Sequence, residues 1–393
     1  MQAEQGSLQE NQELTERSKL SIPERVKQLR TEFAGKDIKF TAFHVEGGFI
    51  PIDRPEMFPQ KPTYIEVDGE LKNGSQTEPV RLITPRDLTD ANVQFRLMQW
   101  AIALRAIDES ADDLGAQELL SHFRLPKVIE FHPVDFVKKG TAIGSMMIER
   151  VWGKPAGGVH LADPDTFETN DLSRMAGFFD LIRRIGRKHD LTLGEDLYHS
   201  HISDRFSDPE NNKWWIDFGP RMKFYNEIFG PDFSLAMYKL LISKRTAALF
   251  DEKHRNGREL VWGNPIPVNM VITSDQKIGI TSMERTAYTY YRAFQEAKFL
   301  SAQVGNEQHF AHFMRSSIEQ NGTELFFRHL QGSFLNDNLI NLEAILKALK
   351  DARQAGSREQ TAFLEKASAN FKIQAEDALY QRNLWDPSQY NLK

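Results

Sequence analysis

The chain has 393 residues, of which 40% are hydrophobic, and a formal net charge of −6, so nothing in its bulk charge favours nucleic-acid binding. It has no cysteine, which excludes disulfides, thiolate metal ligands and a cysteine nucleophile. No apolar run reaches the roughly 20 residues of a membrane helix and no secretory signal is present at the N-terminus, so we expect a cytoplasmic protein without a membrane partner.

The N-terminal third reads as a polar tail followed by a β-rich region. Residues 1–22 are polar and are predicted to form the tail, and residues 23–153 are predicted to form a sheet with one helix. The predicted strands lie at 39–43, 64–68, 80–83, 125–129 and 146–152. Asp90 is placed to cap the helix, whose apolar residues recur every three or four positions.

Helical patterns dominate the rest of the chain. Residues 154–330 are predicted to form a helical region that contains one β-hairpin, and residues 331–393 a C-terminal helical pair. The first of these helices carries four basic residues that we expect on its solvated face, and they are Arg183, Arg184, Arg187 and Lys188.

The hairpin lies within residues 260–285. Residues 268–272 form an apolar strand, residues 274–277 a polar turn, and Ile278 and Ile280 alternate as the return strand. A polar loop that contains Asn264 and Asn269 precedes the hairpin, and Ser282 follows it.

This stretch resembles the phosphotransfer core of the aminoglycoside phosphotransferase and choline kinase group, a branch of the protein-kinase-like fold. That core has the pattern His-Gly-Asp-x-x-x-x-Asn, then a hairpin and an Ile-Asp-(Trp/Phe)-Glu segment. The residues that match are Gly263, Asn269 and Glu284. The residues that differ are Trp262 for the His, Asn264 for the catalytic Asp and Ser282 for the metal-binding Asp. The resemblance implies an α+β, two-lobed fold, with a β-rich N-lobe, a mainly helical C-lobe and a C-terminal helical extension.

The resemblance also implies a nucleotide site in the β-rich region. Gly47 and Gly48 stand where a phosphate-covering loop would lie, although a plain turn explains them equally well. Arg81 and Arg86 are the only cations near the strand that should carry the nucleotide lysine. Glu149 marks the strand that leads to the hinge, whose backbone binds the adenine ring in that family.

The differing residues change the expected chemistry. Phosphoryl transfer needs Mg²⁺ on the phosphates and a carboxylate that accepts the proton of the attacking hydroxyl. Asn264 is neutral and cannot be an anionic base, and Ser282 offers one neutral oxygen where Mg²⁺ prefers a carboxylate. With Asn269 as the remaining metal-site residue, we expect weak or absent binding of ATP and Mg²⁺, and a pseudokinase that acts by binding a small molecule or nucleotide.

Three alternatives remain open at this stage. Asp217 lies in a literal Asp-Phe-Gly and gives a second possible metal site, preceded by His199, His201 and Asp204, which a polar loop explains more simply. An active small-molecule phosphotransferase would need Asp217 or Glu284 to supply the missing carboxylate. A scaffold would bind a protein partner through the C-terminal helices.

Overall fold

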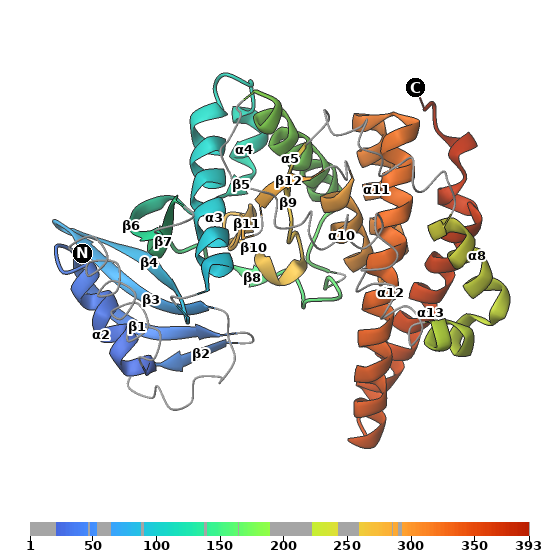
Figure 1. Cartoon of the computed structure of the whole chain (residues 1–393), viewed down its shortest axis with the longest axis horizontal. Coiled ribbons are helices and arrows are strands. Elements are labelled where there is room, and N and C mark those ends of the chain that lie inside the picture. The colour runs from blue at the N-terminus through green and yellow to red at the C-terminus, as the bar shows by residue number, and fades with distance from the viewer. Residues whose placement is uncertain are drawn as a thin grey trace, which may run out of the picture. The chain divides into compact units, whose positions relative to one another are not determined.

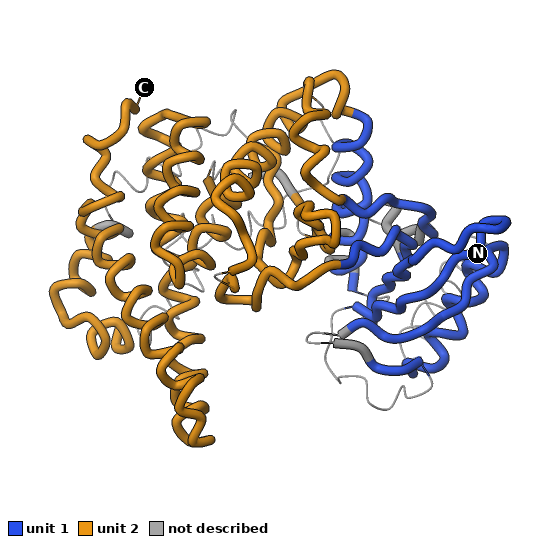
Figure 2. The backbone as a smooth tube through the Cα atoms, turned by 180° about the vertical axis from the view of Figure 1, so that it is seen from behind, with its two compact units in different colours: residues 1–109, 125–152 blue, residues 110–124, 153–393 orange. Residues whose placement is uncertain are grey.

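A computed structural model divides the chain into two compact units (Figure 2). The first unit contains residues 1–109 and 125–152, and the second contains residues 110–124 and 153–393. The structure describes residues 21–45, 48–52, 64–87, 90–136, 140–163, 165–188, 222–242, 259–284, 286–289 and 293–392.

An antiparallel sheet forms the centre of the first unit (Figure 1). Its strand order is β2-β1-β3-β4-β7-β6, so neighbours in sequence are mostly neighbours in the sheet. The strands are β1 (Asp37–Val45), β2 (Gly48–Pro51), β3 (Tyr64–Asn73), β4 (Gln76–Pro85), β6 (Val128–Phe136) and β7 (Gly140–Glu149). The helices are α2 (Ile22–Glu32) and α3 (Ala91–Ser110), the last residue of which belongs to the second unit.

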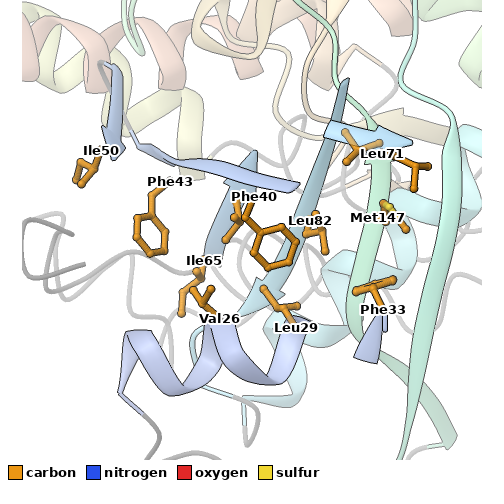
Figure 3. Packing of buried hydrophobic residues seen from close by; sticks show 12 residues of the cluster. Val26, Leu29, Phe33, Phe40, Phe43, Ile50, Ile65, Leu71, Leu82 and Met147 are labelled. Carbon is orange, nitrogen blue, oxygen red and sulfur yellow. The ribbon is translucent and has the colours of Figure 1, made fainter. Parts of the chain in front are cut away.

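Helix α2 covers one face of this sheet. Val26 and Leu29 of α2 pack against Phe40, Ile65 and Leu82 in one buried hydrophobic cluster (Figure 3). Burial of each such side chain stabilises the unit by about 1.5–3 kcal/mol. The sheet therefore has an apolar face under α2.

The opposite face of the sheet carries charged side chains. Successive residues of a strand point to opposite faces, so the neighbours of the apolar residues Val67 and Leu82 point away from α2. Those neighbours include Asp68 of β3 and Arg81 of β4, which are directly paired across the two strands.

The second unit is mainly helical. Its small sheets have the strand orders β5-β11-β10-β8 and β12-β9. The strands are β5 (Phe123–Arg124), β8 (Lys154–Pro155), β9 (Glu259–Trp262), β10 (Met270–Ile272), β11 (Ile278–Ile280) and β12 (Thr286–Thr289). The helices are α4 (Gln117–Ser121), α5 (Thr169–Lys188), α8 (Pro231–Ile242), α10 (Phe294–Ala302), α11 (Glu307–Asn321), α12 (Glu324–Gln354) and α13 (Arg358–Tyr380), and the 3-10 turns are η3 (Pro267–Asn269), η4 (Asn383–Trp385) and η5 (Pro387–Gln389).

Helices α12 and α13 pack against each other as an antiparallel pair (Figure 1). Helix α12 begins at residue 324, where the Thr323 hydroxyl accepts the backbone N–H of Phe326 at 3.0 Å, and it runs through the predicted boundary at residue 331. The C-terminal segment folds back on this unit, because the fully buried Trp385 lies against the rings of Phe327 and Phe334. The four-part division at residues 22, 153 and 330 stays a prediction.

The predicted α+β fold is confirmed, with a β-rich first unit and a mainly helical second unit. The order of elements is the one that the sequence resemblance predicts: a six-strand antiparallel sheet with one inserted helix, then helices that flank a β-hairpin. Within the described ranges, no helix has the length and apolar character needed to cross a membrane.

Candidate functional site

The loop between β9 and β10 is held by its own backbone. The Ile266 N–H donates to Asn264 O and the Asn269 N–H to Ile266 O, each at 2.9 Å, which turns the chain through η3. The following hairpin pairs Met270 with Ile280 and Ile272 with Ile278. The predicted hairpin is therefore present, but its first strand begins at Met270 and not at residue 268, because Pro267–Asn269 form η3.

Four predicted site residues meet at the ends of this loop and hairpin. Asn269 Nδ2 donates to Asn264 O at 2.9 Å, and Asn264 Nδ2 donates to Glu284 Oε1 at 3.2 Å. Ser282 Oγ accepts the backbone N–H of Glu284 at 3.3 Å. A backbone bond from Thr281 N to Asn269 O at 2.9 Å ties the two ends together. We call Asn264, Asn269, Ser282 and Glu284 the loop frame.

All four side chains of the loop frame are half-buried, and three of them are neutral. The single carboxylate, Glu284, already accepts a hydrogen bond from the amide of Asn264. The arrangement can orient a ligand through amide and hydroxyl groups. It offers one carboxylate where Mg²⁺ in a phosphotransfer site is normally held by more.

Trp262 belongs to the hydrophobic core. Its side chain is 0% exposed and lies edge-on to the rings of Phe178 and Phe179 of α5. Trp262, which the sequence resemblance aligns with a histidine, therefore serves packing.

Sequence reasoning missed Gln295, which anchors the start of the loop. Its Oε1 accepts the backbone N–H of Trp262 at 2.9 Å, and its Nε2 donates to Phe179 O at 3.0 Å. The side chain is 0% exposed, so one amide joins β9 to α5 in a dry environment. A glutamine in a helical stretch gives no sequence signal for this role.

A buried ion cluster lies beside β9. Arg183 of α5 pairs with Glu296 of α10 and lies 3.9 Å from Glu259 of β9, which also binds Arg187 at 2.9 Å. Burial disfavours the charged guanidinium, but Glu296, Glu259 and Asp180 together raise the pKa of Arg183 above its usual value. The expectation of a solvated basic face is wrong for Arg183, which is 0% exposed.

Arg81, a predicted phosphate-binding residue, forms ion pairs with carboxylates of the first unit. Its Nε donates to Asp68 Oδ1 at 2.9 Å, and its Nη1 lies 3.3 Å from Glu66 Oε2. The second oxygen of Asp68 pairs with Arg150 Nη2 at 3.0 Å. Asp68 is 0% exposed, so two arginines share one buried carboxylate. We call Asp68, Arg81 and Arg150 the charge cluster.

The charge cluster acts on a neighbouring histidine. Burial lowers the pKa of His44, the positive charges of Arg81 and Arg150 lower it in the same direction, and together they bring it to about 3. His44 of β1 pairs with Glu66 of β3 in the sheet register, which places it on the same face as the charge cluster. This face of the sheet holds a neutral imidazole at ordinary pH.

The other residues that were predicted to bind a nucleotide lie at different places in the first unit or outside the described residues. Glu149 is the last residue of β7, and its backbone N–H donates to Lys127 O at 2.8 Å. Arg86 follows β4 and is half-buried, and Gly48 is the first residue of β2. Gly47 and Asp217 lie outside the described residues, as do His199, His201 and Asp204. The roles assigned to all these residues stay predictions.

No protein-family model and no curated protein matches this sequence. Three phosphotransferases are among the solved structures that are similar to the chain. An aminoglycoside phosphotransferase from Alicyclobacillus acidocaldarius has 12% identity and a TM-score of 0.45, with 80% of this chain and 88% of that chain covered. A choline kinase from Cryptosporidium parvum has 9% identity and a TM-score of 0.44, with 90% and 92% covered. An AMP-bound spectinomycin phosphotransferase has 12% identity and a TM-score of 0.38, with 77% and 90% covered.

At such identities and TM-scores the likeness transfers no ligand, substrate or residue role to this chain. The function has to be argued from the loop frame itself.

Proposed function

We propose that this chain is a kinase-like protein with impaired or absent phosphoryl transfer, which acts by binding a ligand. The observation that carries the proposal is the hydrogen bond from Asn264 Nδ2 to Glu284 Oε1 at 3.2 Å. The sequence resemblance aligns Asn264 with the carboxylate base of a phosphotransferase, and this hydrogen bond gives that residue an amide donor that engages Glu284, the only carboxylate of the loop frame.

The chemistry of transfer explains the consequence. A base must accept the proton of the attacking hydroxyl, and an amide has no basic lone pair for this near neutral pH. The loop frame can therefore position a hydroxyl without activating it.

The described residues do not fit a Mg²⁺ site of the usual kind. Ser282 and Asn264 are neutral, and the described ranges contain no group of three or more His, Asp or Glu residues that could together hold a metal ion. In the first unit, Arg81 is held by Asp68 and Glu66, so its charge is already balanced.

A thermal-shift experiment tests this proposal. The melting temperature is measured with ATP, with and without Mg²⁺, and we expect no Mg²⁺-dependent increase. A ligand at a hundred times its Kd would add about 2.7 kcal/mol to the free energy of unfolding, which is easily detected. A large Mg²⁺-dependent increase would contradict the proposal.

The second candidate is an active phosphotransferase that uses Glu284 in place of the missing aspartates. The observation in its favour is that Glu284 stands inside the loop frame and is only half-buried. ATP turnover of the Glu284→Gln variant distinguishes the two candidate functions. An enzyme that depends on this carboxylate loses ATP turnover in that variant, whereas a binding protein has no turnover to lose.

A further inference from the structure

Helix α13 is buried along one face and exposed along the opposite face. The buried face includes Leu364, Phe371 and Ala378, which recur every seven positions, and α12 packs against this helix (Figure 1). Three of the seven exposed large hydrophobic side chains among the described residues belong to α13, and they are Phe363, Ile373 and Tyr380. Exposed apolar side chains gathered on one element indicate an interaction surface.

The exposed residues of α13 form a line with the spacing of a coiled coil. Six residues are separated alternately by four and three positions, so they lie along one side of the helix, opposite the buried face. At about 1.5 Å per residue the line is about 27 Å long. We call these residues the α13 seam, and they are Ala362, Lys366, Ala369, Ile373, Glu376 and Tyr380.

The two charged residues of the α13 seam are left over within the chain. Lys366 is exposed and Glu376 is half-buried, and neither forms an ion pair or a hydrogen bond with another described residue. The neighbouring Glu365, in contrast, pairs with Arg353 of α12 at 2.7 Å. The α13 seam therefore offers one positive and one negative charge to a partner.

These charges match those of an antiparallel copy of the same helix. A twofold axis through the midpoint of the α13 seam places Lys366 opposite the partner's Glu376, and the same pair recurs on the other side of the axis. A parallel copy in register would place each charge against its own kind, which is unfavourable. Charge therefore selects the antiparallel arrangement.

The side-chain sizes agree with the same arrangement. The twofold axis places Ala369 opposite the partner's Ile373, and Ala362 opposite the partner's Tyr380. Each large exposed side chain thus meets a small one, so two helices can approach closely and remove apolar area from water. Within its own chain, Tyr380 lies edge-on to Phe233 of α8 and stays 38% exposed.

From this complementarity we infer that the α13 seam is the interface of a homodimer, in which two copies of the chain pair their α13 helices antiparallel about a twofold axis. One helix pair of this length buries less area than a permanent dimer, so we expect the dimer to dissociate on dilution. The inference does not depend on the loop frame or on phosphoryl transfer.

Sedimentation equilibrium of the full chain tests for the dimer. Between about 5 and about 200 µM, the weight-average mass of the parent should rise from that of one chain towards that of two. Lys366→Glu and Glu376→Lys should each stay monomeric, whereas the double variant that combines them restores opposite charges and should dimerise like the parent. Lys347→Glu and Glu343→Lys, which change exposed residues of α12, are the matched controls and should also dimerise.

Three outcomes of this experiment overturn the inference. The first is a parent that stays monomeric at the highest concentration. The second is a dimer that the single charge reversals leave intact, because it would then form through another surface. The third is a double variant that stays monomeric where the parent dimerises, because the charges would then not face each other.

Cysteine cross-linking tests the register, since the chain has no cysteine of its own. Oxidation of an equimolar mixture of Ala369→Cys and Ile373→Cys should give a disulfide-linked dimer well above the background of Lys347→Cys. Either seam variant alone should give much less, because its two cysteines lie about 6 Å apart along the axis as well as across the interface, too far for a disulfide. Efficient cross-linking of either variant alone, or none in the mixture, overturns the antiparallel seam.

Discussion

The loop frame and the charge cluster are opposites. The loop frame has one charge, on Glu284, and is closed by amide hydrogen bonds. The charge cluster has three buried charges, two positive and one negative, and Glu66 gives Arg81 a further carboxylate partner. The sequence resemblance predicts catalytic residues in the loop frame and a nucleotide-binding residue, Arg81, in the charge cluster. The loop frame lacks charged groups, and the charge cluster keeps charged groups that are already paired with one another. In both regions, the question for function is therefore whether a charged group is left to bind a ligand.

The largest effect on stability is expected from a substitution that removes Asp68, the carboxylate shared by the two arginines of the charge cluster. Asp68→Asn leaves Arg81 and Arg150 close together and buried, with Glu66 as the one remaining carboxylate partner shown for Arg81. We expect the free energy of unfolding to fall by about 3–5 kcal/mol, as for other buried pairs that lose one member. Urea denaturation measures it, with Glu70→Gln, an exposed residue of β3, as the matched control. A loss as small as the control's would mean that Asp68 does not hold the two arginines.

The next effect concerns the anchor of the loop frame. Gln295→Leu leaves Trp262 N and Phe179 O buried without partners, at a cost of about 1–3 kcal/mol for each group. The expected result is a lower urea midpoint with an unchanged slope. Gln320→Leu, an exposed change on α11, is the control. Equal midpoints for the two variants would show that Gln295 is not an anchor.

The loop frame could be predicted from the sequence more completely than the buried ion clusters could. The hairpin of the loop frame was predictable, because alternation and a polar turn are local signals and the frame residues lie within about twenty positions. The ion clusters were not: Arg183 and Glu296 are 113 residues apart, and nothing in a helical period distinguishes a buried arginine from a solvated one. The ion pair between Arg81 and Asp68 depends on the register of β3 and β4, which could not be predicted from the sequence.

A smaller effect, dependent on pH, distinguishes the charge cluster from the loop frame. The pKa of His44 is about 3 in the folded state and its usual value is 6.5, so between these values the unfolded chain binds a proton that the folded chain does not. The free energy of unfolding should therefore fall as the pH drops below 6.5, by about 2 kcal/mol at pH 5.

Urea denaturation at pH 7 and pH 5 checks this for the parent and for His44→Gln. The parent should lose about 2 kcal/mol more than the variant between the two pH values. The same loss in both proteins would show that His44 is not held neutral by burial and by the two arginines.

The most direct measurement of the central claim is calorimetric Mg²⁺ binding to the double variant Asn264→Asp with Ser282→Asp. The claim is that the loop frame keeps its shape and lacks only its carboxylates. Because Asn264 lies beside Glu284, a second carboxylate there repels it unless a cation is bound. We predict that the double variant melts below the parent without Mg²⁺, regains stability with it, and binds Mg²⁺ in the calorimeter where the parent does not. A double variant that binds Mg²⁺ no better than the parent would contradict the claim that residues 262–284 retain the geometry of a phosphotransfer site.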